Sequence, residues 1–193
     1  MAGVRPRQDR ENDMRILLLT LLLASCAAQP DFRLYSLDVP SGQAGNPLPL
    51  KISVSRPTAE PGYDTASMAY TTREHEIAYY SRNRWVESPD RMLFPILVDS
   101  LSRRFETVLK APAAADMRLE TDIVMLRQEF SGNSSRIHLV IRVQLVKGEK
   151  ILSKKFEALE DCTENDPYGG VIAANRAVSM LVGEIARFCA EHA

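Results

Sequence analysis

Hydrophobic and polar residues alternate with two different periods along this chain, and these periods predict strands and helices. A period of two is typical of a half-buried strand, whereas apolar residues three and four positions apart are typical of an amphipathic helix. We therefore expect strands over most of the chain and two helices between or after them. The segments with strand character are 31–40, 50–57, 68–71, 76–81, 119–130, 136–146 and 150–159.

The strand pattern is clearest where apolar residues fall on one side only. Leu50, Ile52 and Val54 alternate with polar residues, as expected for a strand with one solvated face. Between Ile123 and Leu126 the chain is apolar on both faces, which is typical of a central strand. Short Gly-containing turns separate the last three strands, so we expect these strands to form an antiparallel meander.

The first predicted helix begins at Ser88-Pro89-Asp90, where a capping hydroxyl, a proline and an acidic residue follow one another. Pro95 interrupts the pattern because proline removes a helical hydrogen bond, so we expect a bend or a later helix start there. The apolar residues at helical spacing are Leu93, Leu97, Leu101, Phe105 and Val108.

The second predicted helix begins at Asp166-Pro167, and its apolar stripe should cover the sheet. The order of elements predicts an α+β fold, with a single domain in which a largely antiparallel sheet is covered by two helices. The residues of the stripe are Ile172, Ala174, Val178, Leu181, Ile185 and Phe188.

The strongest apolar run lies near the N-terminus. It extends over 16–23, which is shorter than the roughly 20 residues that a membrane-spanning helix needs. A basic residue before the run and small residues after it are typical of an export signal. Either Met1 or Met14 could be the true start of the chain.

Leu23-Ala24-Ser25-Cys26 resembles the bacterial lipobox. This resemblance implies cleavage between Ser25 and Cys26 and lipidation of Cys26, for example with palmitate. The expected organisation is a signal peptide over 1–25, a lipidated tether over 26–31 and a folded domain over 32–193. The alternative is a secretory signal that is cut elsewhere and contains an incidental cysteine.

The residue after the cysteine influences where a bacterial lipoprotein is sorted. Aspartate at that position tends to retain a lipoprotein in the inner membrane, but here the residue is Ala27. We therefore expect a lipid anchor in the outer membrane, with the domain facing the periplasm.

The charge of the chain limits its partners. Residues 26–193 contain 20 Lys and Arg against 22 Asp and Glu, which gives a formal charge of −2. A nucleic-acid-binding protein usually has a basic surface, so we expect no nucleic-acid partner. A polybasic contact with anionic lipid is disfavoured for the same reason.

Cys162 and Cys189 would lie in an oxidising compartment, where a disulfide could form. Most of the second helix separates them, about 20 residues or roughly 30 Å. Because the Cα atoms of a disulfide lie within about 7 Å of each other, the pattern argues against a bridge but leaves the pairing open.

No residue pattern predicts catalysis, a metal site or a cofactor. None of His75, His138 and His192 has a second ligand at the spacing of a metal motif, so we expect surface histidines. Gly169-Gly170 lies in the first turn of the second helix, where such glycines more often permit close packing than hold an anion.

Aromatic residues are the candidates for binding. Trp85 follows the Tyr79-Tyr80 pair shortly before the first helix. We interpret Trp85 either as a core residue beside the helix start or as a contact with a partner, with the core favoured. Tyr79 and Tyr80 share the same two interpretations.

Together, these segments resemble the ABC-type transport auxiliary lipoproteins. The departures are Met68, where the family has a branched aliphatic residue, Pro95 and the two cysteines Cys162 and Cys189. The matching segments after the lipobox are Arg33-Leu34-Tyr35-Ser36-Leu37, 50–57, 64–70, Tyr79-Tyr80 with Trp85, and Pro89.

The resemblance implies a non-enzymatic accessory lipoprotein of an ABC transporter for lipid transport between the inner and outer membranes. The implied partners are the outer membrane, through the lipid anchor, and an MCE-type periplasmic protein of the inner-membrane transporter. Phospholipid is the implied cargo class, and the sequence leaves homo-oligomerisation open. The alternative is a structural or pilotin-like assembly lipoprotein of another envelope complex.

Overall fold

The computed structural model describes residues 31–40 and 46–193. The predicted signal peptide, Cys26 and all of the tether except Asp31 lie outside the described residues. The chain divides into two units, Met1–Asp31 and Phe32–Ala193, and the architecture below is that of the second unit.

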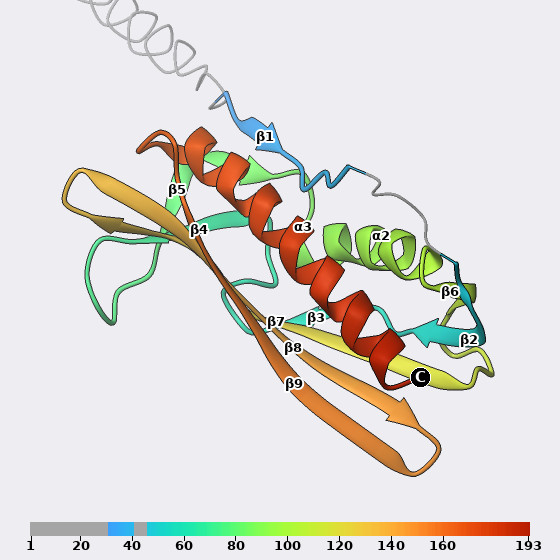
Figure 1. Ribbon diagram of the computed structural model, residues 1–193. Helices are drawn as coiled ribbons and strands as arrows, with labels where there is room; N and C mark the ends of the chain where they lie inside the picture. Colours follow the sequence, from blue (N-terminus) through green and yellow to red (C-terminus); the bar gives the residue numbers. More distant parts are fainter. Residues whose placement is uncertain (1–30, 41–45) are drawn as a thin grey trace, which may run out of the picture. The chain divides into compact units, whose positions relative to one another are not determined.

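The described residues form one nine-stranded sheet with two helices on one of its faces (Figure 1). The strands are β1 (Arg33–Tyr35), β2 (Leu48–Val54), β3 (Thr58–Ala59), β4 (Ser67–Thr71), β5 (Ala78–Trp85), β6 (Phe105–Lys110), β7 (Met117–Ser131), β8 (Ser134–Lys147) and β9 (Lys150–Asp161), and the helices are α2 (Pro89–Ser102) and α3 (Pro167–Glu191).

The long strand β7 organises the sheet. Along one edge it pairs antiparallel with β8, which in turn pairs antiparallel with β9. Along its other edge it takes β2, β3 and β4 one after another, each in parallel. β6 then pairs with β2, β5 with β4, and β1 with β5. The predicted α+β class and the largely antiparallel sheet are confirmed, with the short parallel strands added along one edge of β7.

A β-bulge in β7 changes which residues face the helices. Ile123 pairs with Ile141 and Met125 pairs with Val140, so two residues of β7 advance for one residue of β8. Val124 is therefore the extra residue. Before the bulge Ile123 is buried under the helices, and after it Leu126 is buried on the same face. We interpreted the apolar stretch from Ile123 to Leu126 as a strand buried on both faces. It instead contains the bulge, after which the residues facing the helices change from odd to even numbers, although β7 is central in the sheet as predicted.

The main core lies between the sheet and the two helices. Leu97 of α2 and Leu181 of α3 are fully buried there, and Ser100 donates a hydrogen bond to the Val182 carbonyl at 3.4 Å, which joins the two helices. The predicted stripe of α3 is buried from Ala174 onward. The prediction for Ile172 was wrong, because this residue is only half-buried and lines a surface groove instead.

The first helix is shorter than predicted. Helix α2 ends at Ser102, and Phe105 and Val108 belong to strand β6, which pairs with β2. The helical spacing of these two residues concealed a strand that forms only because β2 supplies its hydrogen-bonding partner.

Proline in the middle of α2 does not delay the helix, contrary to one of our expectations. The helix begins at Pro89, with Ser88 as the residue before it, and continues through Pro95. Both Pro95 and Arg91, whose carbonyl loses its helical donor, are exposed. Water can therefore satisfy this carbonyl, so the proline costs less than it would on the buried side.

The first predicted strand is also shorter, because a side chain replaces its hydrogen-bonding partner. Strand β1 ends at Tyr35. The Asp38 N–H then donates to Oδ1 of Asn175 on α3 at 2.6 Å, and Asn175 Nδ2 donates to the Ser36 carbonyl at 3.3 Å. The chain after β1 is thus held against α3 rather than in the sheet.

The remaining differences lie around β4 and β5. Strand β5 runs over Ala78–Trp85 instead of 76–81, and the short strand β3 was not predicted. On the face of the sheet away from the helices, which we call the open face, Tyr63, Ala69 and Val140 are buried outside the main core. The chain between β3 and β4 therefore covers part of the open face.

Candidate functional site

Charged side chains from three adjacent strands meet on the open face. We call Arg127, Glu129, Arg136, His138 and Glu157 the charged cluster. They come from β7, β8 and β9, at the end of the sheet that also carries the β7–β8 turn. The bulge places Arg127 and Glu129, because residues of β7 after Val124 with odd numbers point away from the helices, and the pairing brings His138 opposite Arg127 and Arg136 opposite Glu129.

Glu129 is the centre of the charged cluster. Its Oε1 accepts from Arg127 Nη2 at 2.8 Å, and its Oε2 accepts from Arg136 Nη2 at 3.1 Å. Burial raises the pKa of this carboxyl, but hydrogen bonds from Arg127, His138 and Arg136 outweigh burial and lower the pKa to about 2. Glu129 is thus a carboxylate whose acceptor positions are taken by the side chains of Arg127, Arg136 and His138.

His138 joins two carboxylates. Its Nδ1 lies 3.0 Å from Oε1 of Glu129, and its Nε2 lies 2.7 Å from Oε1 of Glu157. A carboxylate can only accept hydrogen bonds, so both contacts are satisfied when the imidazole carries a proton on each nitrogen. His138 lies outside the main core, on the polar side of its strand as expected, but its side chain is only 17% exposed and both ring nitrogens are engaged.

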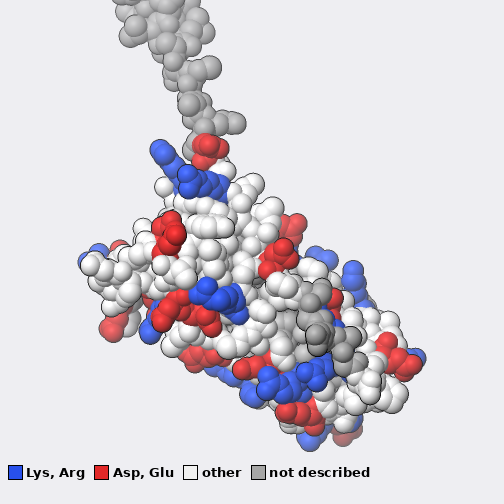
Figure 2. Space-filling model, turned by 45° about the horizontal axis from the view of Figure 1, so that its top comes forward, with Lys and Arg blue, Asp and Glu red and all other residues white. Residues whose placement is uncertain are grey.

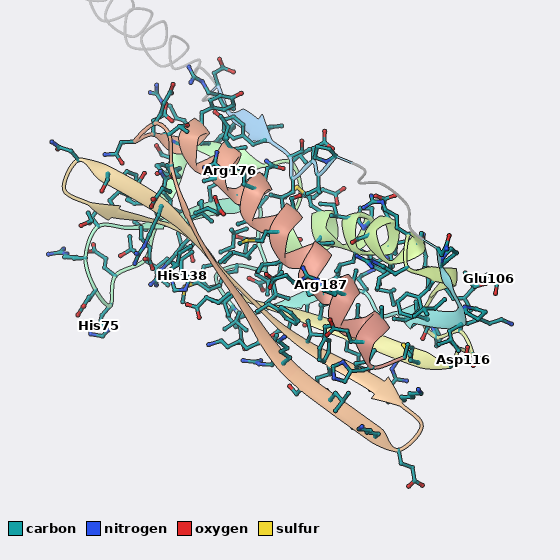
Figure 3. All side chains as sticks on the ribbon, viewed as in Figure 1. His75, Glu106, Asp116, His138, Arg176 and Arg187 are labelled. Carbon is teal, nitrogen blue, oxygen red and sulfur yellow. The ribbon has the colours of Figure 1, made fainter. Side chains whose placement is uncertain are left out.

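A cavity of about 590 Å³ lies beside the charged cluster. One wall is the β4–β5 loop, including His75, which adopts a left-handed backbone conformation with φ of 63°. The other wall is the end of the β7–β8 hairpin, including Arg136. Figure 3 labels His75 at the tip of its loop and His138 on the sheet. Both signs of charge line this cavity, which therefore fits a mixed polar surface better than a simple anion.

A second polar network lies on the helix-facing side of the sheet, around Gln128. Its Nε2 donates to Ser135 Oγ at 2.8 Å and to the Asp166 carbonyl at 3.1 Å, and its Oε1 accepts from Tyr80 at 2.9 Å. Burial raises the pKa of Tyr80, which keeps its hydroxyl a donor. The network fixes the start of α3 against the sheet, and Tyr80 takes part in it rather than pointing into solvent.

The paired glycines at the start of α3 permit close packing. A Cβ at Gly170 would meet Oε1 of Gln128, and a Cβ at Gly169 would meet the Glu164 carbonyl. The Asp166 side chain accepts from the Gly169 N–H at 2.7 Å and so caps the helix. The capping carboxylate occupies the place that an anion would take.

The other aromatic candidates have opposite environments. Trp85 is 4% exposed and belongs to the main core, which is the environment that the core interpretation describes. Tyr79 is 45% exposed on the open face and donates to the Gly62 carbonyl at 3.3 Å. Of the three aromatic candidates, Tyr79 presents the most surface to a partner.

Both cysteines within the described residues are free thiols. Cys189 is fully buried in α3, and burial raises its pKa to about 12. Cys162 is half-buried beside the Gln128 network, and burial raises its pKa as well. Neither thiol is therefore activated as a nucleophile.

Neither a metal site nor a membrane-spanning helix is found in the part of the chain that the structure describes, residues 31–40 and 46–193. These residues contain no group of three His, Cys, Asp or Glu side chains placed to hold a metal ion. They also contain no helix that is both long enough and apolar enough to cross a bilayer. Cys26, the predicted lipidation site, and Ser25 lie outside the described residues.

The charged cluster was not predicted, because no local motif in the sequence marks it. The Arg127/Glu129 and Arg136/His138 pairs occupy alternate positions on two neighbouring strands. A register for the predicted β7–β8 hairpin would have placed Glu129 opposite Arg136. The signal was therefore present in the strand pattern and the turn, but not in the spacing of any one segment.

Comparison with known proteins supports the fold. A family model described as the ABC-type transport auxiliary lipoprotein component matches residues 35–186. The structure of protein XCC0632 from Xanthomonas campestris is similar, with a TM-score of 0.71 and 15% identity, covering 80% of this chain and 92% of its own. The structure of an uncharacterized protein has a TM-score of 0.64 and 15% identity, covering 80% of this chain and 95% of its own. No curated protein matches the sequence.

Proposed function

The chain belongs to the family of ABC-type transport auxiliary lipoprotein components, and on this premise we propose that it serves lipid transport between the two membranes of a bacterial envelope. In this proposal it is a non-enzymatic accessory that Cys26 anchors to the periplasmic face of the outer membrane. Its partner is an MCE-type periplasmic protein of an inner-membrane ABC transporter, and phospholipid is the cargo. The family match over residues 35–186 is the observation that carries the proposal.

The mechanism that we propose is positional. Acyl chains on Cys26 hold the N-terminus at the membrane, since each buried CH₂ contributes about 0.8 kcal/mol. The tether from Cys26 to Asp31 spans at most ~20 Å when fully extended. The domain is therefore kept close to the anchor and presents a fixed surface to the transporter.

The contacts of the charged cluster favour a binding role over catalysis. Glu129 accepts from two arginines and His138, and His138 has a carboxylate at each ring nitrogen. A general base needs a free lone pair directed at its substrate, but the Glu129 oxygens accept from neighbouring side chains and both ring nitrogens of His138 face carboxylates. The cluster instead stiffens three strands beside the cavity, where Arg136 remains 49% exposed. We propose this cavity as the docking site for the periplasmic partner.

The anchor is tested by metabolic labelling in the native host. Labelled palmitate should appear on the wild-type protein and be absent from Cys26→Ser, which should also leave the membrane fraction. If wild-type protein carries no label and fractionates as a soluble protein, the anchor is wrong.

The partner is tested by cross-linking in intact cells, followed by purification and identification of the attached proteins. The variant Arg136→Glu reverses one charge of the cavity. Arg118→Glu is the matched control, because Arg118 lies at the other end of β7, is 50% exposed and is also ion-paired. We expect Arg136→Glu to lose the MCE-type partner and Arg118→Glu to retain it. Recovery of secretin or porin-assembly subunits instead would favour the assembly lipoprotein, and equal loss in both variants would remove the cavity as the docking site.

A further inference from the structure

A groove of about 580 Å³ lies along the solvent side of α3. One wall is the chain after β1, with Asp38 and Pro40. The other is α3, which contributes Tyr168, Val171, Ile172, Asn175, Arg176, Ser179 and Met180. We call four uncharged residues among these, Tyr168, Ile172, Ser179 and Met180, the α3 stripe, because all of them line the groove from the same helix. Tyr168 is 52% exposed and Met180 is 42% exposed, so the stripe presents apolar surface to its surroundings.

The α3 stripe lies in a part of the helix that is almost free of charge. Over 167–183, Arg176 is the only charged residue of the sequence. Arg176 lines the groove and is 42% exposed, but its charge is paired: its Nε donates to Glu160 at 3.2 Å and its Nη2 to the Asp161 carbonyl at 2.6 Å, which directs the guanidinium toward β9. Figure 3 labels Arg176 in this part and Arg187 in the charged part that follows.

Elsewhere the charged residues of the domain are mixed. Figure 2 shows Lys and Arg interspersed with Asp and Glu, with uncharged areas between them. A surface of this kind gives no strong attraction to anionic lipid. A contact between the α3 stripe and a lipid surface would therefore depend on burial of apolar side chains rather than on charge.

The groove begins close to the point where the described chain starts. The Tyr168 ring centroid lies 6.1 Å from that of Tyr35, the last residue of β1. Arg33, the first residue of β1, follows Cys26 by seven positions. At no more than about 3.6 Å per residue, this connection reaches at most ~25 Å. A lipid surface that holds Cys26 is thus within reach of the α3 stripe.

We propose that the α3 stripe rests on the lipid surface into which Cys26 is anchored. This inference depends on the proposed function, because it requires the acylated cysteine. An amphipathic helix can lie in the plane of a membrane with its apolar side chains inserted to a depth of about 5–10 Å. The open face, on the other side of the sheet, then points away from this membrane. In this orientation of the domain, the α3 stripe can contact lipid while the open face contacts a periplasmic partner.

The test measures how close the stripe lies to lipid. Acylated protein purified from the native host is reconstituted into phosphatidylcholine vesicles with and without brominated acyl chains, which quench nearby tryptophan. Tyr168→Trp places the probe on the α3 stripe, and Tyr79→Trp is the control, because Tyr79 is similarly exposed but lies on the open face. The emission of wild-type protein, which has Trp85 alone, is subtracted.

We expect the tryptophan added by Tyr168→Trp to lose emission with brominated lipid, and the one added by Tyr79→Trp to keep it. The loss should be the same at low and high salt, and adding Met180→Glu to Tyr168→Trp should abolish it without changing flotation of the vesicles with protein. Equal emission with both lipids would overturn the contact. A shift that depends on protein concentration and not on bromine would assign the stripe to a second copy of the chain. Failure to float at all would overturn both the anchor and this inference.

Discussion

Replacing Glu129 by glutamine should make the stability of the domain less dependent on pH. In the native state the carboxylate of Glu129 accepts hydrogen bonds from Arg127, Arg136 and His138, and its side chain is 17% exposed. These contacts lower the pKa from 4.5 to about 2, against the opposing effect of burial. Protonation of this carboxyl therefore costs more in the folded state than in the unfolded state.

The size of the effect follows from the pKa difference. One pH unit corresponds to about 1.4 kcal/mol, so a fall from 4.5 to about 2 corresponds to roughly 3 kcal/mol of unfolding free energy. The folded-state pKa is the lower one, so this contribution is fully present above pH 4.5. It is lost progressively as the pH falls from about 5 toward about 2, where the folded state also binds the proton.

The assay is urea denaturation, followed by circular dichroism, at several pH values between 7 and 2.5. The difference in unfolding free energy between wild-type protein and Glu129→Gln should be largest above pH 5 and should shrink by about 2–3 kcal/mol toward pH 2.5. Glu149→Gln is the control, since Glu149 is exposed in the β8–β9 turn and forms no ion pair with any described residue. A difference between wild type and Glu129→Gln that stays constant across this range would refute the reasoning.

Three further predictions concern packing. Trp85→Ala should lower the unfolding free energy by about 3–5 kcal/mol, because the ring lies in the main core, and an unchanged melting temperature would contradict this. Gly170→Ala should lower the unfolding free energy by about 1–3 kcal/mol in the same denaturation assay, because its Cβ would displace Gln128 from its hydrogen bonds. Gly183→Ala, whose Cβ would meet open space, should instead raise the unfolding free energy by up to about 1 kcal/mol. Cys189 should resist alkylation at pH 8 until the protein is denatured, as mass spectrometry can show, since burial raises its pKa to about 12.

The parts of the fold that depend on local patterns could be predicted from the sequence. Strands β7, β8 and β9 are close to the predicted ranges, because alternation is uninterrupted over most of their length. The start of α2 is correct because Pro89 suits the first helical position, although the Ser88 hydroxyl that we expected to cap the helix makes no capping hydrogen bond. The start of α3 is correct for the same reason, with the Asp166 side chain accepting from the helix backbone.

The parts that depend on distant partners could not be predicted. Phe105 and Val108 have helical spacing, yet they form a strand because β2 lies beside them. The chain after Tyr35 has strand character, yet Asn175 holds its backbone instead. In each case a contact between residues far apart in the sequence overrides the local period.

The candidate site also depends on a contact that the local pattern does not reveal, namely the pairing that makes Val124 an extra residue in β7. Because Val124 is an extra residue in β7, the two sides of the strand exchange after it. Gln128 then faces α3 and reaches Tyr80 and the Asp166 carbonyl, while Arg127 and Glu129 face outward. Without the bulge the same alternation would direct an arginine and a glutamate into the main core, where unpaired charge is prohibitively costly. The bulge therefore fixes both the attachment of α3 and the charged cluster, and only the pairing with β8 reveals it.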